Sequence, residues 1–213
     1  MRLLAITPIH VSDDELRRRQ GRYDRLAPQG VSVRLEDVGS GSHVPRSLET
    51  AEDIVASEEA LLARFGQADL TDVDGLLPDC VLDPVVEHEQ SIPLPVFGIC
   101  RLSAHFLAGF GGRLGAVARN QAIASELDRK LKSYGMTPER STVVLDLSVE
   151  DIADDALWAA AVDRTVASLP CDYVINACSA VDIARSVAGP TLVDPTWTAL
   201  RLVAMAGTVG GPA

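Results

Sequence analysis

Two cysteines stand at matching points of the sequence, each after a short apolar run that predicts a buried strand. The run Leu76–Asp79 precedes Cys80, and the run Val174–Ala177 precedes Cys178. Loops and helix N-termini converge at the carboxyl ends of parallel strands, and ligands collect there. A thiol at a helix N-terminus faces the positive end of the helix dipole, which favours the thiolate. Two such thiols across a cleft would form an acid/base pair. A single cysteine of this kind is more often an ordinary core residue.

An internal repeat strengthens the functional interpretation. The first strands of the two halves superimpose at an offset of about 110 residues, and the second strands do so at nearly the same offset. The four matching segments are Leu3–Thr7 with Leu114–Ala118, and Val31–Asp37 with Ser141–Leu147. The two cysteine segments match at an offset of about 100 residues. Each half therefore carries its own cysteine in the same place.

Short β-branched runs alternate with helical patterns along the whole chain, which predicts an α/β fold with parallel strands. The predicted strands are Leu3–Thr7, Val31–Val38, Val73–Pro78, Leu94–Ile99, Leu114–Ala118, Ser141–Leu147, Tyr173–Ala177 and Thr191–Val193. The predicted helices are Asp13–Leu26, Leu48–Phe65, Asp83–Gln90, Ser103–Phe110, Gln121–Tyr134, Glu150–Leu169, Val181–Val187 and a last one from Thr196 to Met205.

Composition narrows the class of partner. The 213 residues carry a formal net charge of −11, which opposes nucleic-acid binding because phosphate recognition needs clustered Lys and Arg. The one basic run, Arg17–Arg19, lies among acidic residues and predicts a solvated helix face. The apolar segment Leu3–Ile9 is too short for a membrane span or a signal sequence, so we expect a cytoplasmic protein without membrane contact.

The remaining cysteines fit a structural role. Cys100 and Cys171 lack the strand-end context of the other two, and the cysteine spacing matches neither a disulfide scaffold nor a zinc motif. We expect free thiols and no metal.

At this point the sequence resembles a known family. The segment Asp79–Pro84, followed by Pro95–Ile99 and Ala104-His105, resembles the first-cysteine region of the aspartate/glutamate racemase superfamily, and most closely its hydantoin and allantoin racemase branch. The segment Ile175–Ala180 resembles the second-cysteine region. The resemblance implies two pseudo-symmetric Rossmann-like halves, each with a four-stranded parallel sheet, and an active site in the cleft between them. It places residues 1–99 plus 195–213 in the first lobe and 100–194 in the second.

The same resemblance implies a reaction without a cofactor. One cysteine, as thiolate, would remove the proton alpha to a carbonyl, and the other, as thiol, would return a proton to the opposite face. The developing enolate needs fixed hydrogen-bond donors. The candidates are the backbone amides of Val81, Leu82, Ser179 and Ala180.

The sequence departs from the family pattern around the substrate. An Asn-Pro-Asn-Thr-like segment is replaced by Thr7-Pro8-Ile9-His10, and a Thr pair is replaced by Arg119-Asn120. We expect Thr7, His10, Arg119 and Asn120 to contact substrate, together with Ser47 in a segment that is partly similar to the family. For His10 and Arg119 the alternatives are a structural hydrogen bond and a solvated charge. His105 matches a helix histidine of the family, with packing as its alternative role.

Three functions remain open. The first is a racemase or epimerase that acts on a hydantoin-like or related small substrate through Cys80 and Cys178. The second keeps the fold but makes the protein a cis-trans isomerase or a decarboxylase; the decarboxylases of this superfamily typically retain one of the two cysteines. The third is a non-catalytic two-lobed protein that binds a small molecule. Symmetric self-association is expected for a small two-lobed enzyme.

Overall fold

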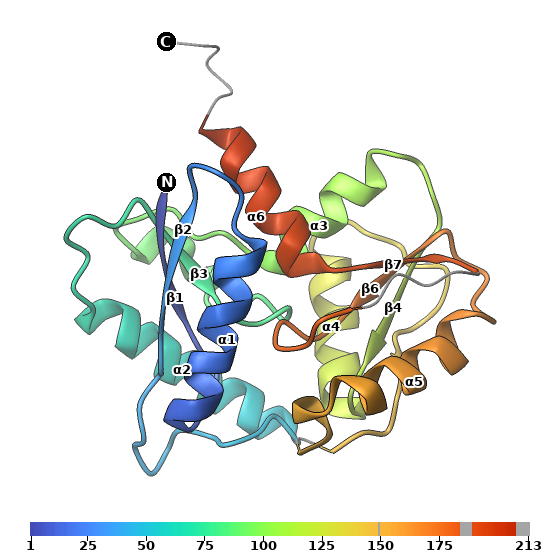
Figure 1. Cartoon of the computed structure of the whole chain (residues 1–213), viewed down its shortest axis with the longest axis horizontal. Helices are drawn as coiled ribbons and strands as arrows, with labels where there is room; N and C mark the ends of the chain where they lie inside the picture. The colour runs from blue at the N-terminus through green and yellow to red at the C-terminus, as the bar shows by residue number, and fades with distance from the viewer. Residues whose placement is uncertain (149, 184–188, 208–213) are drawn as a thin grey trace.

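The computed structural model describes residues 1–148, 150–183 and 189–207. Two parallel sheets form its framework (Figure 1). The first has the order β2-β1-β3, with strands Arg2–Ile6 (β1), Ser32–Glu36 (β2) and Gly75–Pro78 (β3). The second has the order β5-β4-β6-β7, with strands Leu114–Ala118 (β4), Val143–Val144 (β5), Tyr173–Asn176 (β6) and Thr191–Val193 (β7). The predicted α/β class and its two-lobed arrangement are confirmed.

The first sheet lacks its predicted fourth strand. The segment predicted as the strand Leu94–Ile99 contributes a single parallel bridge, Val96 to Leu76. Pro95 removes one amide donor from this segment, and Ile99 already begins a helix. A proline cannot donate to a sheet ladder, so the pairing stops after two hydrogen bonds.

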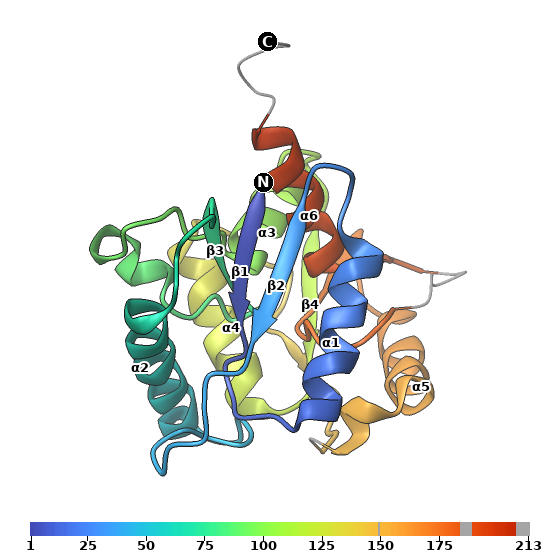
Figure 2. The ribbon, with the colours of Figure 1, turned by 60° about the vertical axis from the view of Figure 1, so that its left-hand side comes forward.

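Helices cover both sheets. They are Asp13–Leu26 (α1), Ala51–Gln67 (α2), Ile99–Ala108 (α3), Gln121–Ser133 (α4), Asp155–Val166 (α5) and Pro195–Ala206 (α6). Figure 2 shows α1 and α2 to either side of the first sheet. Helix α6 packs against α3 and α1, and α3 and α6 lie together between the two sheets (Figure 1). None of the helices within the described ranges is both long and apolar enough to cross a membrane.

Three predicted helices differ from the structure. The prediction Asp83–Gln90 is replaced by a short 3-10 helix, Val86–Ser91, and Glu150–Leu169 divides into a 3-10 turn, Glu150–Ala153, and α5. Of the predicted helix Val181–Val187, residues 181–183 are not helical and the others lie outside the described residues. No α-helix therefore begins directly after either cysteine within the part of the chain that the structure describes.

One apolar core joins the two halves. It contains Leu77 of β3, Ala118 of β4, Ile175 of β6 and Leu200 of α6, all 0% exposed. Because both sheets contribute to one cluster, their strand ends are held next to each other. The division into lobes at residues 99 and 195 stays a prediction.

A buried carboxylate caps α3 from outside the helix. Asp83 is fully buried and accepts the amides of Cys100 at 2.8 Å and Arg101 at 2.6 Å, together with the hydroxyl of Tyr134 at 2.9 Å. A Cβ atom at Gly98 would lie 2.6 Å from its Oδ2, so glycine leaves room for the carboxylate. Burial raises the pKa of Asp83 to about 6, although these donors oppose the shift.

This raised pKa predicts a pH-dependent stability. The folded chain keeps the Asp83 proton up to about pH 6, whereas the unfolded chain releases it near the ordinary pKa of 3.8. The stabilising contribution of this group is therefore complete below the ordinary pKa and is lost as the pH rises through 6, with a slope of about 1.4 kcal/mol per pH unit in between. We expect Asp83→Asn to lack this slope.

Urea unfolding of both proteins at several values between about pH 4 and pH 7 measures the effect, because other carboxylates contribute equally to both. The free energy of unfolding of the wild type minus that of the variant should fall across this range. Parallel pH profiles would contradict the assignment.

Candidate active site

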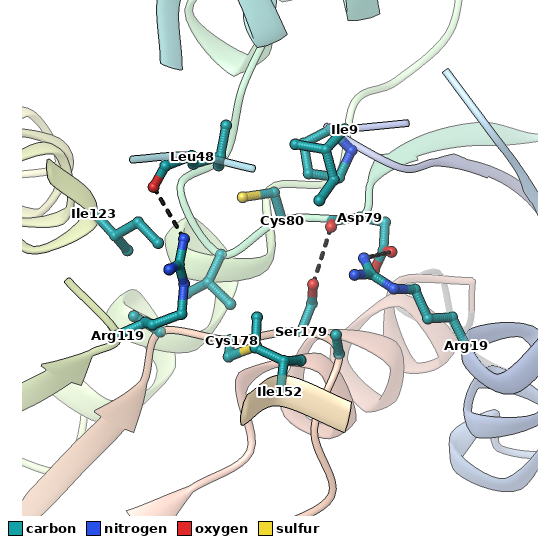
Figure 3. A pocket seen from close by; sticks show the side chains of 14 residues that line it. Ile9, Arg19, Leu48, Asp79, Cys80, Arg119, Ile123, Ile152, Cys178 and Ser179 are labelled. Atoms are coloured by element: carbon teal, nitrogen blue, oxygen red, sulfur yellow. Dashed lines mark hydrogen bonds and ion pairs between the residues drawn. The ribbon is translucent and has the colours of Figure 1, made fainter. Parts of the chain in front are cut away.

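The two cysteines line one cavity. Cys80 lies two residues after the end of β3, and Cys178 lies two residues after the end of β6. Both border a cavity of ≈ 60 Å³ at which the turn after β1, the segment before α2, the end of β4 and Ile152 also meet. Figure 3 shows Cys80 and Cys178 on opposite sides of this space. The arrangement brings together the residues that the internal repeat predicted.

A second cavity adjoins the cysteine cavity. It measures ≈ 260 Å³ and includes Arg46 in its lining. The two cavities share Ile9, Arg19 and Ile152. These three side chains therefore border both spaces.

A direct hydrogen bond joins the two cysteine segments. The hydroxyl of Ser179 donates to the carbonyl of Asp79 at 2.9 Å, so the residue after one cysteine is bound to the residue before the other. Asn176 holds the second segment by donating to the carbonyl of Cys178 at 3.0 Å, and its own oxygen accepts from the indole of Trp158 at 3.1 Å.

Helix α1 fixes both segments from the side. The buried carboxylate of Asp79 accepts from the Tyr23 hydroxyl at 2.7 Å and from Arg19 Nη1 at 3.2 Å. One turn further along the helix, buried Arg22 donates through Nε to the carbonyl of Val181 at 3.0 Å. It also pairs with Asp194 at the start of α6 at 2.6 Å. One helix therefore contacts both cysteine loops.

The sequence predicted that a helix N-terminus would favour the thiolate, whereas burial acts against it at both cysteines. Burial raises the pKa of Cys80 to about 12; the amide of Leu82 opposes the shift, whereas Asp79 and Asp83 add to it. Burial also raises the pKa of Cys178, and here the amide of Ala180 and the cations Arg19 and Arg22 oppose the shift. Cys178 is also the more exposed of the two thiols. Its surroundings therefore favour ionisation more than those of Cys80 do.

The four predicted backbone donors divide into two pairs. The amides of Leu82 and Ala180, each two residues after a cysteine, donate to the cysteine sulfurs. Val81 and Ser179 line the cavity, and within the described residues their amides have no hydrogen-bond acceptor in the protein. These two amides are the ones free to bind a ligand oxygen.

Two residues predicted to contact substrate act on loop structure instead. Thr7 is fully buried and donates to the carbonyl of Ile9 at 2.8 Å. His10 bonds through Nδ1 to the Asp37 carboxylate at 2.9 Å. Neither lines the cysteine cavity, but they shape the turn that carries Ile9 into it.

The other predicted contacts lie around the segment before α2. Ser47 lies outside the cavity lining, whereas its neighbour Leu48 is part of it. Asn120 caps α4 by accepting the amide of Ile123 at 3.0 Å, and donates to the carbonyl of Leu48 at 2.8 Å. Arg119 lines the cavity and is 3% exposed, so the alternative of a solvated charge is wrong.

Three further residues that the sequence analysis considered, His105, Cys100 and Cys171, lie outside the cavity lining. His105 is exposed on α3 and lies outside the lining. Cys100 and Cys171 are buried, and Cys171 packs so closely that a Cβ at Gly115 would lie 2.5 Å from its sulfur. In the ranges that the structure describes, no three His, Cys, Asp or Glu side chains gather as a metal site.

The sequence interpretation missed Arg19 and Asp79. Arg19 belongs to the run predicted as a solvated helix face, yet it is 7% exposed and pairs with Asp79 at the cavity. A signal was present, because Arg19, Arg22 and Tyr23 recur at the spacing of one helix face. All three are buried.

Comparison with known proteins identifies the family. The model of the Asp/Glu/Hydantoin racemase family matches residues 24–203, and the chain belongs to this family. No curated protein sequence matches the chain.

Solved structures with the same fold include three of interest. An allantoin racemase from Klebsiella pneumoniae is 18% identical, with 99% of this chain and 89% of that chain covered and a TM-score of 0.78. An allantoin racemase from Pseudomonas fluorescens is 14% identical, with 99% and 92% covered and a TM-score of 0.77. A maleate isomerase from Pseudomonas putida S16 is 12% identical, with 97% and 92% covered and a TM-score of 0.61. At these identities the likeness is one of fold.

The environments of the two thiols predict their reactivity. We expect iodoacetamide to label Cys178 before Cys80, with a rate that still rises above about pH 9 because both thiol pKa values exceed the ordinary range. Arg19→Gln should slow labelling of Cys178 several-fold at a fixed pH, because it removes a cation that favours the thiolate.

Peptide mass spectrometry after timed alkylation measures both rates. Arg17→Gln, on the same helix but with its side chain 71% exposed, is the matched control and should leave the rate unchanged. Faster labelling of Cys80, or a rate that levels off below about pH 8, would contradict this assignment.

Proposed function

We propose that the chain is a cofactor-independent racemase or epimerase that moves a proton at a carbon alpha to a carbonyl. The observation that carries the proposal is the placement of Cys80 and Cys178 on opposite sides of one cavity. A two-base reaction needs an acid and a base on opposite faces of a planar intermediate. Membership of the racemase family supports the same reaction class.

The two cysteines have different roles at the start of the reaction. For one enantiomer we assign Cys178 as the thiolate, because the cations of Arg19 and Arg22 oppose the effect of burial on its pKa. Cys80 is then the thiol, because the carboxylates of Asp79 and Asp83 add to the effect of burial on its pKa. The two cysteines exchange roles for the other enantiomer. A thiolate of high pKa is a strong base, which suits a weakly acidic carbon, although few molecules carry it at neutral pH.

The substrate contacts follow from the lining. Removal of the alpha proton moves negative charge onto the carbonyl oxygen. We propose that the amides of Val81 and Ser179 help to stabilise this charge, because both residues line the cavity. The substrate is a small molecule of the hydantoin or allantoin kind, in line with the fold shared with two allantoin racemases.

A second candidate is cis-trans isomerisation through addition of one cysteine to the substrate. The maleate isomerase of the same fold favours it. The two reactions differ in a measurable way, because only racemisation exchanges the alpha proton with solvent. A non-catalytic binding protein would show neither exchange nor isomerisation.

The test is proton-exchange NMR in D2O on 5-substituted hydantoins, allantoin, and amino and arylmalonic acids. We expect wild type to exchange the alpha proton of a hydantoin-like substrate. Cys80→Ser and Cys178→Ser should each reduce racemisation by about 10³-fold or more, because a serine hydroxyl is a far weaker acid and base than a thiol at neutral pH.

Cys100→Ser serves as the matched control, since Cys100 is buried outside the cavity lining. It should retain exchange at the wild-type rate per folded molecule. Exchange that each variant loses or keeps with only one enantiomer would support the two-base proposal, whereas exchange at the wild-type rate with both enantiomers in Cys80→Ser and in Cys178→Ser would overturn it. Conversion of maleate without alpha-proton exchange would establish the isomerase instead.

A further inference from the structure

Arg119 carries a buried hydrogen-bond donor that the protein does not use. Among the described residues, the buried side-chain nitrogens and oxygens without a partner are Arg119 Nε and Thr196 Oγ1. Of these two residues, Arg119 lines the cysteine cavity. An unsatisfied buried donor costs about 1–3 kcal/mol and more when it is charged. Such a donor at a ligand cavity indicates a ligand atom that completes it.

The other donors of this guanidinium fix its orientation. Nη2 donates to the carbonyl of Leu48 at 3.1 Å. Nη1 pairs with Glu49 at 2.8 Å and reaches the carbonyl of Leu147 at 3.4 Å. These contacts come from both halves of the chain and engage the end of the guanidinium. Figure 3 shows the guanidinium beside the space between Cys80 and Cys178, with its tip directed to Leu48. Nε, which is buried, is left without a partner among the described residues, and the side chain that carries it lines the cavity.

We propose that Arg119 donates from Nε to the carbonyl oxygen of the substrate whose alpha proton the cysteines move, an inference that rests on the proposed function. As the thiolate takes the proton, the C–H electron pair moves into the carbon–carbon bond and the carbonyl pair moves onto oxygen. Arg119 keeps its own proton, because a guanidinium does not deprotonate in proteins, and stabilises the enolate through a charge-assisted hydrogen bond. The thiol then protonates carbon from the opposite face.

The charges around the cavity define the class of carbonyl. Arg119 is paired with Glu49, and Arg19 is paired with Asp79, so the two cations in the lining are already balanced. A carboxylate placed against Arg119 would find no surplus positive charge. A neutral carbonyl gains from the donor without adding charge before the reaction begins. Arg119 therefore favours an amide, imide or ureide carbonyl over a free carboxylate.

Replacement of the side chain tests the role directly. Arg119→Lys keeps the charge but removes the planar donor, and we expect kcat for alpha-proton exchange to fall by about 10²-fold with a smaller change in KM. Arg113→Lys is the matched control, because Arg113 forms an exposed ion pair with Asp172 far from the lining. It should keep wild-type kinetics.

Chemical rescue separates enolate stabilisation from a merely structural contact between the halves. In Arg119→Ala, free guanidinium at about 10–50 mM should restore kcat at least ten-fold, because it supplies the same planar donor, whereas equal ammonium should not. A variant that has lost only a structural contact would show a lower melting temperature and a raised KM, with no preference for guanidinium.

Glu49→Gln tests the charge argument. The amide still offers an oxygen to Arg119 but leaves its positive charge unbalanced. We expect binding of carboxylates such as arylmalonate to strengthen several-fold and binding of neutral hydantoin to change little. Equal effects on the two ligands would overturn the preference for a neutral carbonyl.

The outcomes separate this inference from the proposed function. Wild-type exchange that persists at the same kcat in Arg119→Lys would overturn the role of Arg119 and leave the racemase intact. Wild-type protein that binds hydantoin, measured by calorimetry, but exchanges no proton would overturn the racemase and, with it, the catalytic role of Arg119. Hydantoin that neither binds nor exchanges would overturn both.

Discussion

The buried carboxylate of Asp79 is the interaction on which the site depends. Without partners, such a group would cost several kcal/mol, yet it is 1% exposed. Its carboxylate is bound by Tyr23 and Arg19, its amide by the carbonyl of Ile6, and its own carbonyl by Ser179. Strand β1, helix α1 and the second cysteine segment therefore all meet at the residue next to Cys80. The position of the Cys80 sulfur therefore depends on the contacts that the Asp79 carboxylate makes with Arg19 and Tyr23.

The burial that positions the sulfurs also opposes their ionisation. Both thiols have raised pKa values, so each thiolate is a strong base that few molecules carry at neutral pH. Nearby charges decide which of the two thiols ionises more readily. The two halves are alike in backbone but differ in charge. Cations face Cys178, and Asp83 adds its carboxylate on the side of Cys80. A repeated framework with unlike charges gives two cysteines of equal placement and unequal acidity.

The sequence predicted the framework well because its signals are local. The short apolar runs that form β4, β6 and β7 can be found without knowledge of distant contacts. The same is true of the repeated placement of the two cysteines. The predicted strand Leu94–Ile99 was wrong because Pro95 removes a ladder donor, a signal that was present in the sequence. The thiol acidities and the Arg19–Asp79 pair could not be predicted in the same way, because burial and pairing between residues about 60 apart arise only from the tertiary fold. His10 shows the same limit, since its partner Asp37 decides that it shapes a loop.

Arg19 and Arg22 link helix α1 to the two cysteine segments. They lie three residues apart on α1, a rise of about 4.5 Å along the helix. Arg19 holds the segment of Cys80 through Asp79, and Arg22 holds the segment of Cys178 through the carbonyl of Val181. Both cysteine segments are thereby tied to one helix. A displacement of α1 would move the two segments together.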